Sequence, residues 1–116
     1  MTFMDIQPVA RGHMLIVPRN HAAFLADLDE EDGAQLFRAG QLAAADLRNS
    51  TIRCEGVNLF LADGEAAGQE IVHVHLHVFP RFSGDGFGLR LPPDYSVRPR
   101  AELDQAAEDL RQGWPS

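Results

Sequence analysis

Several features that define other protein classes are missing from this chain of 116 residues. It has a single cysteine, Cys54, so no disulfide can form within the chain and no Cys-x-x-Cys pair is present to bind zinc. No apolar run approaches the ~20 residues that a membrane helix needs, and the N-terminus does not resemble a signal peptide. These absences predict a cytoplasmic protein without a membrane partner.

Positive charge is also scarce. Seventeen acidic residues stand against ten basic ones, which gives a formal net charge of -7. Because nucleic acids are bound through clustered Lys and Arg, this balance predicts no nucleic-acid partner, and any anionic ligand must be attracted locally. Hydrophobic residues make up 45% of the chain and charged residues 23%, as in ordinary globular proteins. The length suits one domain over residues 1–116.

Hydrophobic spacing predicts an α+β fold with a mainly antiparallel sheet. Residues 13–18 (HMLIVP) and 56–62 (GVNLFLA) are short aliphatic runs typical of strands. Between them, from Asp29 to Asn49, apolar residues recur at three- and four-residue spacing, which predicts one long helix. Its buried face is predicted to carry Leu36, Phe37, Gly40, Ala43, Ala44 and Leu47. Residues 101–112 predict a short C-terminal helix.

Three histidines alternate with aliphatic residues in the segment 71–82 (IVHVHLHVFPRF). On a strand, successive side chains point to opposite faces. His73, His75 and His77 are therefore predicted to share one face, roughly 7 Å from one neighbour to the next. The core face is predicted to carry Val72, Val74, Leu76 and Val78. The Gly-rich stretch 63–70 joins this segment to 56–62, so the two strands are most simply antiparallel.

The residues alone leave three explanations of the histidine pattern open. The histidines could be ordinary polar residues on the wet face of a half-buried strand. They could bind a metal such as zinc, with Glu70 or His13 completing the ligand set, but no Cys cluster accompanies them. They could act on phosphate, with one neutral imidazole as nucleophile and the others donating hydrogen bonds to the oxygens. The last explanation supplies anion-binding donors without a basic surface.

The motif His-x-His-x-His followed by two apolar residues, here HVHLHVF, resembles the defining motif of the histidine triad (HIT) superfamily of nucleotide hydrolases and transferases. Two ordered blocks are also similar to that family: FMDIQPVARGHMLIVPRNH at 3–21 and DGEAAGQEIVHVHLHVFPRFSGDG at 63–86. The similarity covers about residues 3–88 and leaves 89–116 as a C-terminal extension. The stretch FPRFSGDGFG looks most like the branch of the fragile histidine triad protein and related bacterial dinucleoside polyphosphate hydrolases.

This resemblance implies a role in catalysis for four histidines. His75 would attack the α-phosphorus of a nucleotide and form a nucleotidyl-histidine intermediate, which water then hydrolyses. Its other ring nitrogen would donate to the backbone carbonyl of His73, which would orient the site. His77 would hydrogen-bond phosphate oxygens, and His13 would line the same site from the neighbouring strand. The mechanism requires no cofactor and no metal site, and Mg²⁺ would only accompany a polyphosphate substrate.

The resemblance also implies a set of substrate contacts. Asp5 matches a residue that binds the ribose hydroxyls. Glu70 stands where some branches have Ser or Thr, and we expect its carboxylate near the leaving group or in proton transfer. The other substrate-binding residues lie in the base pocket and in the loop before the triad, where backbone amides approach the phosphates: Phe3, Ile6, Gly68, Gln69 and Ile71.

The predicted function is hydrolysis of a dinucleoside polyphosphate or related nucleotide conjugate by a homodimer. The alternatives are a nucleoside phosphoramidase or nucleotidyltransferase, and a non-catalytic nucleotide-binding adaptor. Two departures from the family favour the adaptor. Ala62 stands where the family usually has an Asn or Gln near the scissile bond, and the chain starts almost directly at FMDI, before which the family has a further segment.

Overall fold

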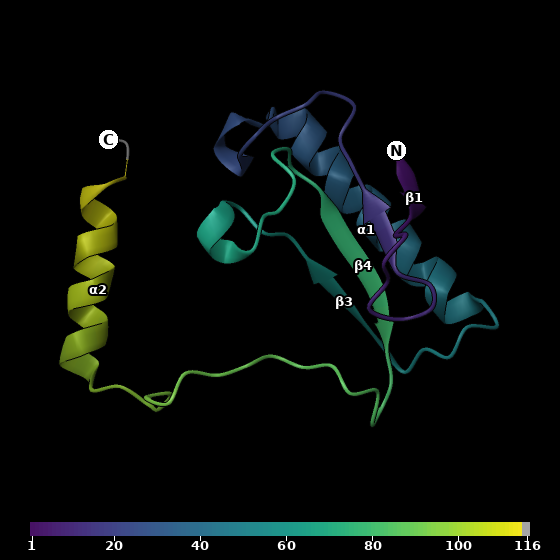
Figure 1. Ribbon diagram of the computed structural model, residues 1–116. Coiled ribbons are helices and arrows are strands. Elements are labelled where there is room, and N and C mark those ends of the chain that lie inside the picture. The colour runs from purple at the N-terminus through teal and green to yellow at the C-terminus, as the bar shows by residue number, and fades with distance from the viewer. Residues whose placement is uncertain (115–116) are drawn as a thin grey trace.

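The structure, a computed structural model, describes residues 1–114 and has the predicted α+β architecture (Figure 1). A four-stranded antiparallel sheet with strand order β1-β2-β4-β3 is covered on one face by a long helix. The strands are β1 (Thr2–Met4), β2 (Met14–Ile16), β3 (Gly56–Phe60) and β4 (Leu76–Arg81). The helices are α1 (Glu30–Asn49), α2 (Arg100–Gln112) and the short 3-10 turns η1 (Leu25–Asp27) and η2 (Glu65–Ala67).

Helix α1 begins and ends close to the predicted limits because its sequence carries the appropriate end signals. Asp29 is the N-cap, and its side chain accepts a hydrogen bond from the backbone N–H of Glu31 at 2.9 Å. Acidic residues fill the first turn and Arg48 lies in the last, so both ends complement the helix dipole. No helix among residues 1–114 is long and apolar enough to cross a membrane.

The buried face of α1 is narrower than the spacing predicts. Leu36, Gly40, Ala43 and Leu47 pack against the sheet. Ala44 is only half-buried and Phe37 is 60% exposed, so the prediction that Phe37 lies in the core is wrong. Phe37 is rotated by about 100° from Leu36 around the helix axis, which carries it past the edge of the contact. At Gly40 the sheet comes so close that a Cβ would lie 3.0 Å from Leu59.

The histidine segment joins the sheet later than the alternation predicts. Strand β4 begins at Leu76, so of the three histidines only His77 lies within it. Val74, Leu76 and Val78 are buried in the core, as predicted. Val72 is 76% exposed, which corrects its predicted core position. The change from exposed to buried residues occurs at Val74. Its backbone N–H donates to the carbonyl of Ala22 at 2.7 Å, which holds the segment against the chain that follows β2.

Two features of the fold were not predicted from the sequence. Strand β1 has only three residues, so it is too short to show a recognisable periodic pattern in the sequence. It pairs with β2 alone, with Phe3 opposite Leu15. Helix α2 was predicted, but it stands apart from the rest of the molecule at the end of an extended segment (Figure 1). Residues 1–87 are called the body below, and residues 88–114 are called the arm.

Candidate active site

Histidine residues gather on the face of the sheet that α1 leaves uncovered. His77 lies directly opposite Leu15 of β2 and Phe60 of β3, and residues opposite each other in antiparallel strands share a face. The next residue, Val78, is fully buried in the core beneath α1, so His77 points to the other side. We call this surface the histidine face.

The ring of His75 is held by a backbone contact. Its Nδ1 lies 2.9 Å from the carbonyl oxygen of His73, the contact that the resemblance implies. Because a carbonyl oxygen only accepts, Nδ1 must carry the proton, and in the neutral ring the lone pair is on Nε2. The residue is 7% exposed, and its ring centroid is 4.9 Å from that of His77. The rings are thus closer than the predicted strand spacing.

His13 and His77 are joined in a chain of hydrogen bonds that assigns their tautomers. The backbone N–H of Val9 donates to Nδ1 of His13 at 3.0 Å, so the proton of neutral His13 is on Nε2. That nitrogen lies 2.9 Å from Nδ1 of His77 and donates to it. The proton of His77 is therefore on its Nε2, which makes no hydrogen bond among the described residues. His77 thus offers an N–H donor on the histidine face.

Burial keeps this pair neutral. Loss of solvation lowers the pKa of His13, and the carboxylate of Asp5 opposes this only in part. The pKa of His77 is also lowered, chiefly by burial and then by the neighbouring His75 and His13, against the opposing charges of Asp5 and Glu70. Both imidazoles are therefore neutral near pH 7, as their hydrogen bonds require.

Asp5 lies beside the histidine pair. Its Oδ2 is 3.5 Å from Nε2 of His13 and 4.0 Å from Nδ1 of His77, and its Oδ1 accepts from the backbone N–H of Gln7 at 2.8 Å. The ligand atoms of Asp5, His13 and His77 lie within 4.8 Å of one another, so one metal ion could contact all three. The structure therefore places the residue matched to ribose binding next to two of the predicted catalytic histidines.

The loop before the triad is held by its own hydrogen bonds. The side chain of Gln69 accepts from the backbone N–H of Gly64 at 2.7 Å and donates to the carbonyl of Ala23 at 2.9 Å. The backbone N–H groups of Gly68 and Gln69 are also bonded within the loop, to Glu65 and Gly64. Among the described residues, the N–H groups of Glu70, Ile71 and Val72 have no hydrogen-bond partner. Three consecutive amides are therefore free where this loop leads into the histidine segment.

The backbone conformation of the loop favours a glycine at position 68. Its φ of +99° is in the left-handed region that disfavours side chains, while a Cβ added there would meet nothing within 4 Å. The backbone turn is therefore sufficient reason for a glycine at this position.

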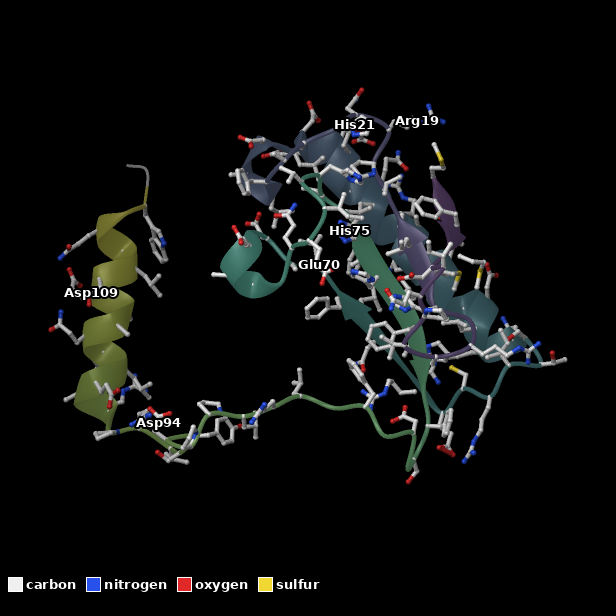
Figure 2. All side chains as sticks on the ribbon, in the orientation of Figure 1. Arg19, His21, Glu70, His75, Asp94 and Asp109 are labelled. Atoms are coloured by element: carbon white, nitrogen blue, oxygen red, sulfur yellow. The ribbon has the colours of Figure 1, made fainter. Side chains whose placement is uncertain are left out.

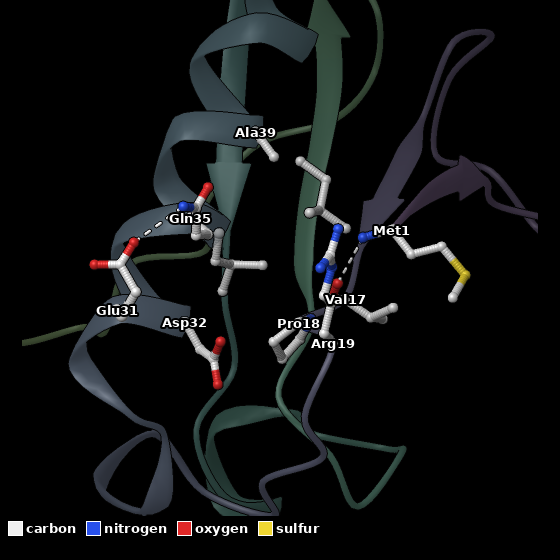
Figure 3. Close-up of a pocket in the computed structure, with 10 residues that line it drawn as sticks. Met1, Val17, Pro18, Arg19, Glu31, Asp32, Gln35 and Ala39 are labelled. Atoms are coloured by element: carbon white, nitrogen blue, oxygen red, sulfur yellow. Dashed lines mark hydrogen bonds between the residues drawn. The ribbon is translucent and has the colours of Figure 1, made fainter.

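The predicted base-pocket residues are not brought into an enclosed site. Phe3 is half-exposed on β1, and Ile6 is fully exposed. A cavity of about 430 Å³ lies between the end of β2 and the first turns of α1, beside Arg19, Glu31 and Asp32 (Figure 3). Its other lining residues include Ile16 and Leu36 of the core, so it is on the helix side of the sheet, away from the histidine face.

The sequence missed one hydrogen-bond donor that organises the site. The N–H of Val9 sets the tautomer of His13, and a backbone group leaves no signal in the sequence. The ring of His21 packs edge-on against His73 at 5.4 Å between centroids. Ala62, which stands where the family usually has Asn or Gln, is buried. The two polar side chains near it in the sequence that could replace the amide already make hydrogen bonds within the chain. Asp63 accepts from the N–H of Leu25, and Asn58 accepts from Arg81.

Comparison with known proteins places the chain in a family. Residues 1–84 match the model of the HIT domain. A HIT-like protein of Borreliella burgdorferi is 37% identical over 92 residues, which cover 78% of this chain and 66% of that protein, so the chain spans about two thirds of that relative. Adenosine 5'-monophosphoramidase hnt1 of Schizosaccharomyces pombe is 30% identical over 95% of this chain and 78% of its own length.

Solved structures agree with the sequence comparison. The crystal structure of a HIT family member from Bacillus subtilis superposes with a TM-score of 0.84 at 29% identity, covering 99% of this chain and 82% of that one. The four-stranded antiparallel sheet and its helices are thus a fold shared with that protein. The family model matches residues 1–84, and both relatives are at least 30% identical over more than three quarters of this chain. The chain therefore belongs to the HIT domain family.

Proposed function

We propose that the chain binds a nucleotide conjugate and hydrolyses it at the α-phosphate, with His75 as the nucleophile. The observation that carries this proposal is the contact between Nδ1 of His75 and the carbonyl of His73. It holds the ring proton on the far nitrogen and leaves a lone pair on Nε2, which is the form of imidazole that attacks phosphorus. Nε2 remains open to solvent although the residue is largely buried.

The proposed reaction has two displacements. Nε2 of His75 bonds to the α-phosphorus while the bond from phosphorus to the leaving group breaks, and the leaving group takes up a proton from solvent. Water then attacks phosphorus and gives up a proton to solvent, the phosphorus–nitrogen bond breaks, and neutral His75 returns with a nucleoside monophosphate released. Charge on the phosphoryl oxygens meets Nε2–H of His77 and the free N–H groups of Glu70 and Ile71. Mg²⁺ enters only as a companion of a polyphosphate substrate.

A second cavity favours one kind of leaving group. It measures about 590 Å³ and is lined by Phe24, Glu65, Gly68, Gln69, Glu70 and Val72. Glu70 is labelled in Figure 2, and its charge raises the pKa of His77, so it acts on the histidine face. Two carboxylates repel a polyphosphate and attract a protonated amine. We therefore favour a phosphoramidate with an amine leaving group, the bond class in the name of the S. pombe relative, over a dinucleoside polyphosphate.

A substrate panel with two histidine variants tests the proposal. His75→Ala is expected to lower kcat by about 10⁴-fold or more while nucleotide binding is largely kept, because only the nucleophile is lost. His21→Ala, an exposed histidine close to the site, is the matched control and should keep most of the activity. Rapid quenching of the unmodified protein should trap a nucleotidyl group on His75, detected by peptide mass spectrometry.

The same panel separates the rival functions. Faster turnover of adenosine phosphoramidates than of diadenosine polyphosphates supports the amine leaving group, and the reverse order supports the predicted polyphosphate hydrolase. Binding of nucleotide without hydrolysis of either class overturns the enzyme proposal and leaves a non-catalytic binding protein.

A further inference from the structure

Residues 5–13 form the hairpin that joins β1 to β2, and they hold Asp5 beside His13. The backbone N–H of Asp5 donates to the carbonyl of His13 at 3.0 Å, and the N–H of Gln7 donates to Oδ1 of Asp5 at 2.8 Å. The second carboxylate oxygen, Oδ2, accepts no hydrogen bond from residues 1–114. It lies 3.5 Å from Nε2 of His13 and 4.0 Å from Nδ1 of His77. The hairpin thus holds an unused acceptor against both imidazoles.

One proton in this cluster lies between two acceptors. The Nε2–H of His13 points to Nδ1 of His77, 2.9 Å away, while Oδ2 of Asp5 lies 3.5 Å from the same Nε2. The imidazole is the nearer acceptor, but a carboxylate forms the stronger hydrogen bond because it is charged. Asp5 therefore competes with His77 for the proton of His13.

The result of this competition decides where the proton of His77 lies. When His13 donates to Nδ1 of His77, the proton of neutral His77 is on Nε2, where it meets phosphate. When His13 donates to Asp5 instead, nothing fixes the tautomer of His77. The charge of Asp5 reaches both rings, because burial lowers the pKa of each imidazole and Asp5 opposes this at each. A carboxylate that is occupied elsewhere therefore leaves His77 as the better donor.

A substrate can reach Asp5 and His77 together. Their side chains are 15% and 23% exposed, whereas that of His13 is 3% exposed. In a nucleotide, the ribose hydroxyls are the hydrogen-bond donors nearest to the α-phosphate, and carboxylates in nucleotide sites accept from them. With the phosphate at Nε2–H of His77, the ribose is the part of the substrate that supplies a donor to Oδ2 of Asp5.

We propose that the sugar of the substrate controls the phosphate donor: ribose hydroxyls that bind Oδ2 of Asp5 release the proton of His13 to His77 and so speed the chemical step. Asp5 is then a positioning residue as well as a sugar contact, because it acts on the phosphate through His13. The site selects ribonucleotides by rate as well as by affinity. This inference rests on the proposed function, since it takes the α-phosphate to bind beside His77.

Two substrates that differ only in the sugar test this coupling. An adenosine phosphoramidate and its dideoxyribose analogue, which lacks both hydroxyls, are compared in single-turnover experiments that separate the chemical step from product release. Hydroxyls that only add affinity change KM and leave the chemical rate unchanged. We expect the analogue to react about tenfold more slowly at saturation, because a weaker donor meets the charge that develops on the phosphoryl oxygens.

Two carboxylate-to-amide variants show whether Asp5 carries the effect. Asp5→Asn removes the charged competitor for the proton of His13, so the two substrates should react at rates within about twofold of each other. Glu70→Gln removes a charge that acts on His77 and not on His13, so it should keep the ratio at about tenfold. Each ratio compares two substrates on one protein, so a general loss of activity cancels.

Nitrogen NMR of the imidazole rings measures the same coupling without turnover. With AMP bound, Nδ1 of His77 should give the signal of an unprotonated nitrogen, and Nε2 should give that of a protonated one. With the dideoxyribose analogue of AMP, the two signals should move toward each other, because the two tautomers then exchange. A purely structural role of Asp5 leaves the two spectra alike.

The possible failures have separate meanings. Equal chemical rates for the two sugars, or a ratio that is lost equally in Glu70→Gln, overturn the coupling and leave the proposed hydrolysis standing. Failure to hydrolyse either substrate contradicts the proposed function. In that case the spectra decide the coupling alone, and identical His77 signals with the two forms of AMP overturn it.

Discussion

The histidine face and the arm differ in how far their side chains are engaged by contacts within the chain. On the histidine face, His13 and His77 bond to each other, and His75 bonds to the backbone. Among the described residues, no buried side-chain nitrogen or oxygen lacks a hydrogen-bond partner. On the arm, large apolar side chains such as Leu110 and Trp114 are turned to solvent. Hydrogen bonds within the chain organise the histidine face, whereas the apolar side chains of the arm have few packing contacts.

The largest expected effect comes from breaking the hydrogen-bond chain on the histidine face. In His13→Leu, nothing donates to Nδ1 of His77, so its tautomer is free and its Nε2 no longer reliably offers a proton to phosphate. We expect kcat to fall by about 100-fold, as for loss of one oriented donor. His13→Gln retains an amide donor and should recover part of the rate. Equal losses in the two variants would show that His13 contributes packing rather than a proton.

The next effect compares the same substitution in the two regions. Val78 is fully buried in β4, and Val97 of the arm is almost completely exposed. Val78→Ala should lower the free energy of unfolding by about 2 kcal/mol through lost burial and a cavity. Val97→Ala should change it by less than about 0.5 kcal/mol. Urea denaturation measures both, and a similar cost at the two sites would contradict the contrast between body and arm.

Lowering the pH should decrease the free energy of unfolding through the histidine face and not through the arm. The folded-state pKa values of His13 and His77 lie below the ordinary histidine value of 6.5, so the unfolded chain binds more protons as pH falls below that value. The free energy of unfolding is therefore fully retained above about pH 6.5 and decreases as pH falls toward the folded-state pKa values. In His13→Gln the pH dependence should be weaker. An unchanged profile in that variant would assign the acid sensitivity to other groups.

The smallest effect is expected where the two regions meet. Arg81→Lys keeps the charge but loses the forked donors that hold Asp85 and the Phe87 carbonyl. Residues 82–87 should exchange their amide hydrogens faster, with little change in overall unfolding. Arg90→Lys, the same change on the exposed part of the arm, is the control. Slow exchange at 82–87 in Arg81→Lys would mean that the aromatic contact between Phe79 and Phe87 suffices to anchor the arm.

Local patterns predicted the helices closely because their causes are local. The long helix was expected over 29–49 and runs over Glu30–Asn49, since its cap and its apolar spacing lie within its own sequence. The C-terminal helix was expected over 101–112 and runs over Arg100–Gln112. Burial was predicted less well, as Phe37 and Val72 show. Spacing tells which residues share a face, but the neighbouring element decides how wide the covered face is.

The candidate site divides in the same way. The alternation of His73, His75 and His77 was readable in the sequence, and with it the resemblance to the HIT family. The pairing of His13 with His77 across 64 positions of the chain was not readable as a hydrogen bond, nor was the place of Asp5 beside them. Gln69, expected to approach phosphate, uses its side chain to hold the loop. Such contacts depend on how strands are brought together.

The sequence by itself determined the residue types that this protein brings to its chemistry, the family and the order of its main elements, because each depends on composition and short-range spacing. Only the tertiary structure decided which ring nitrogen carries each proton, which loop amides stay free and which apolar surfaces are left uncovered. Those properties arise where distant segments meet. A hydrogen-bond partner or a packing neighbour exists only once the chain has folded.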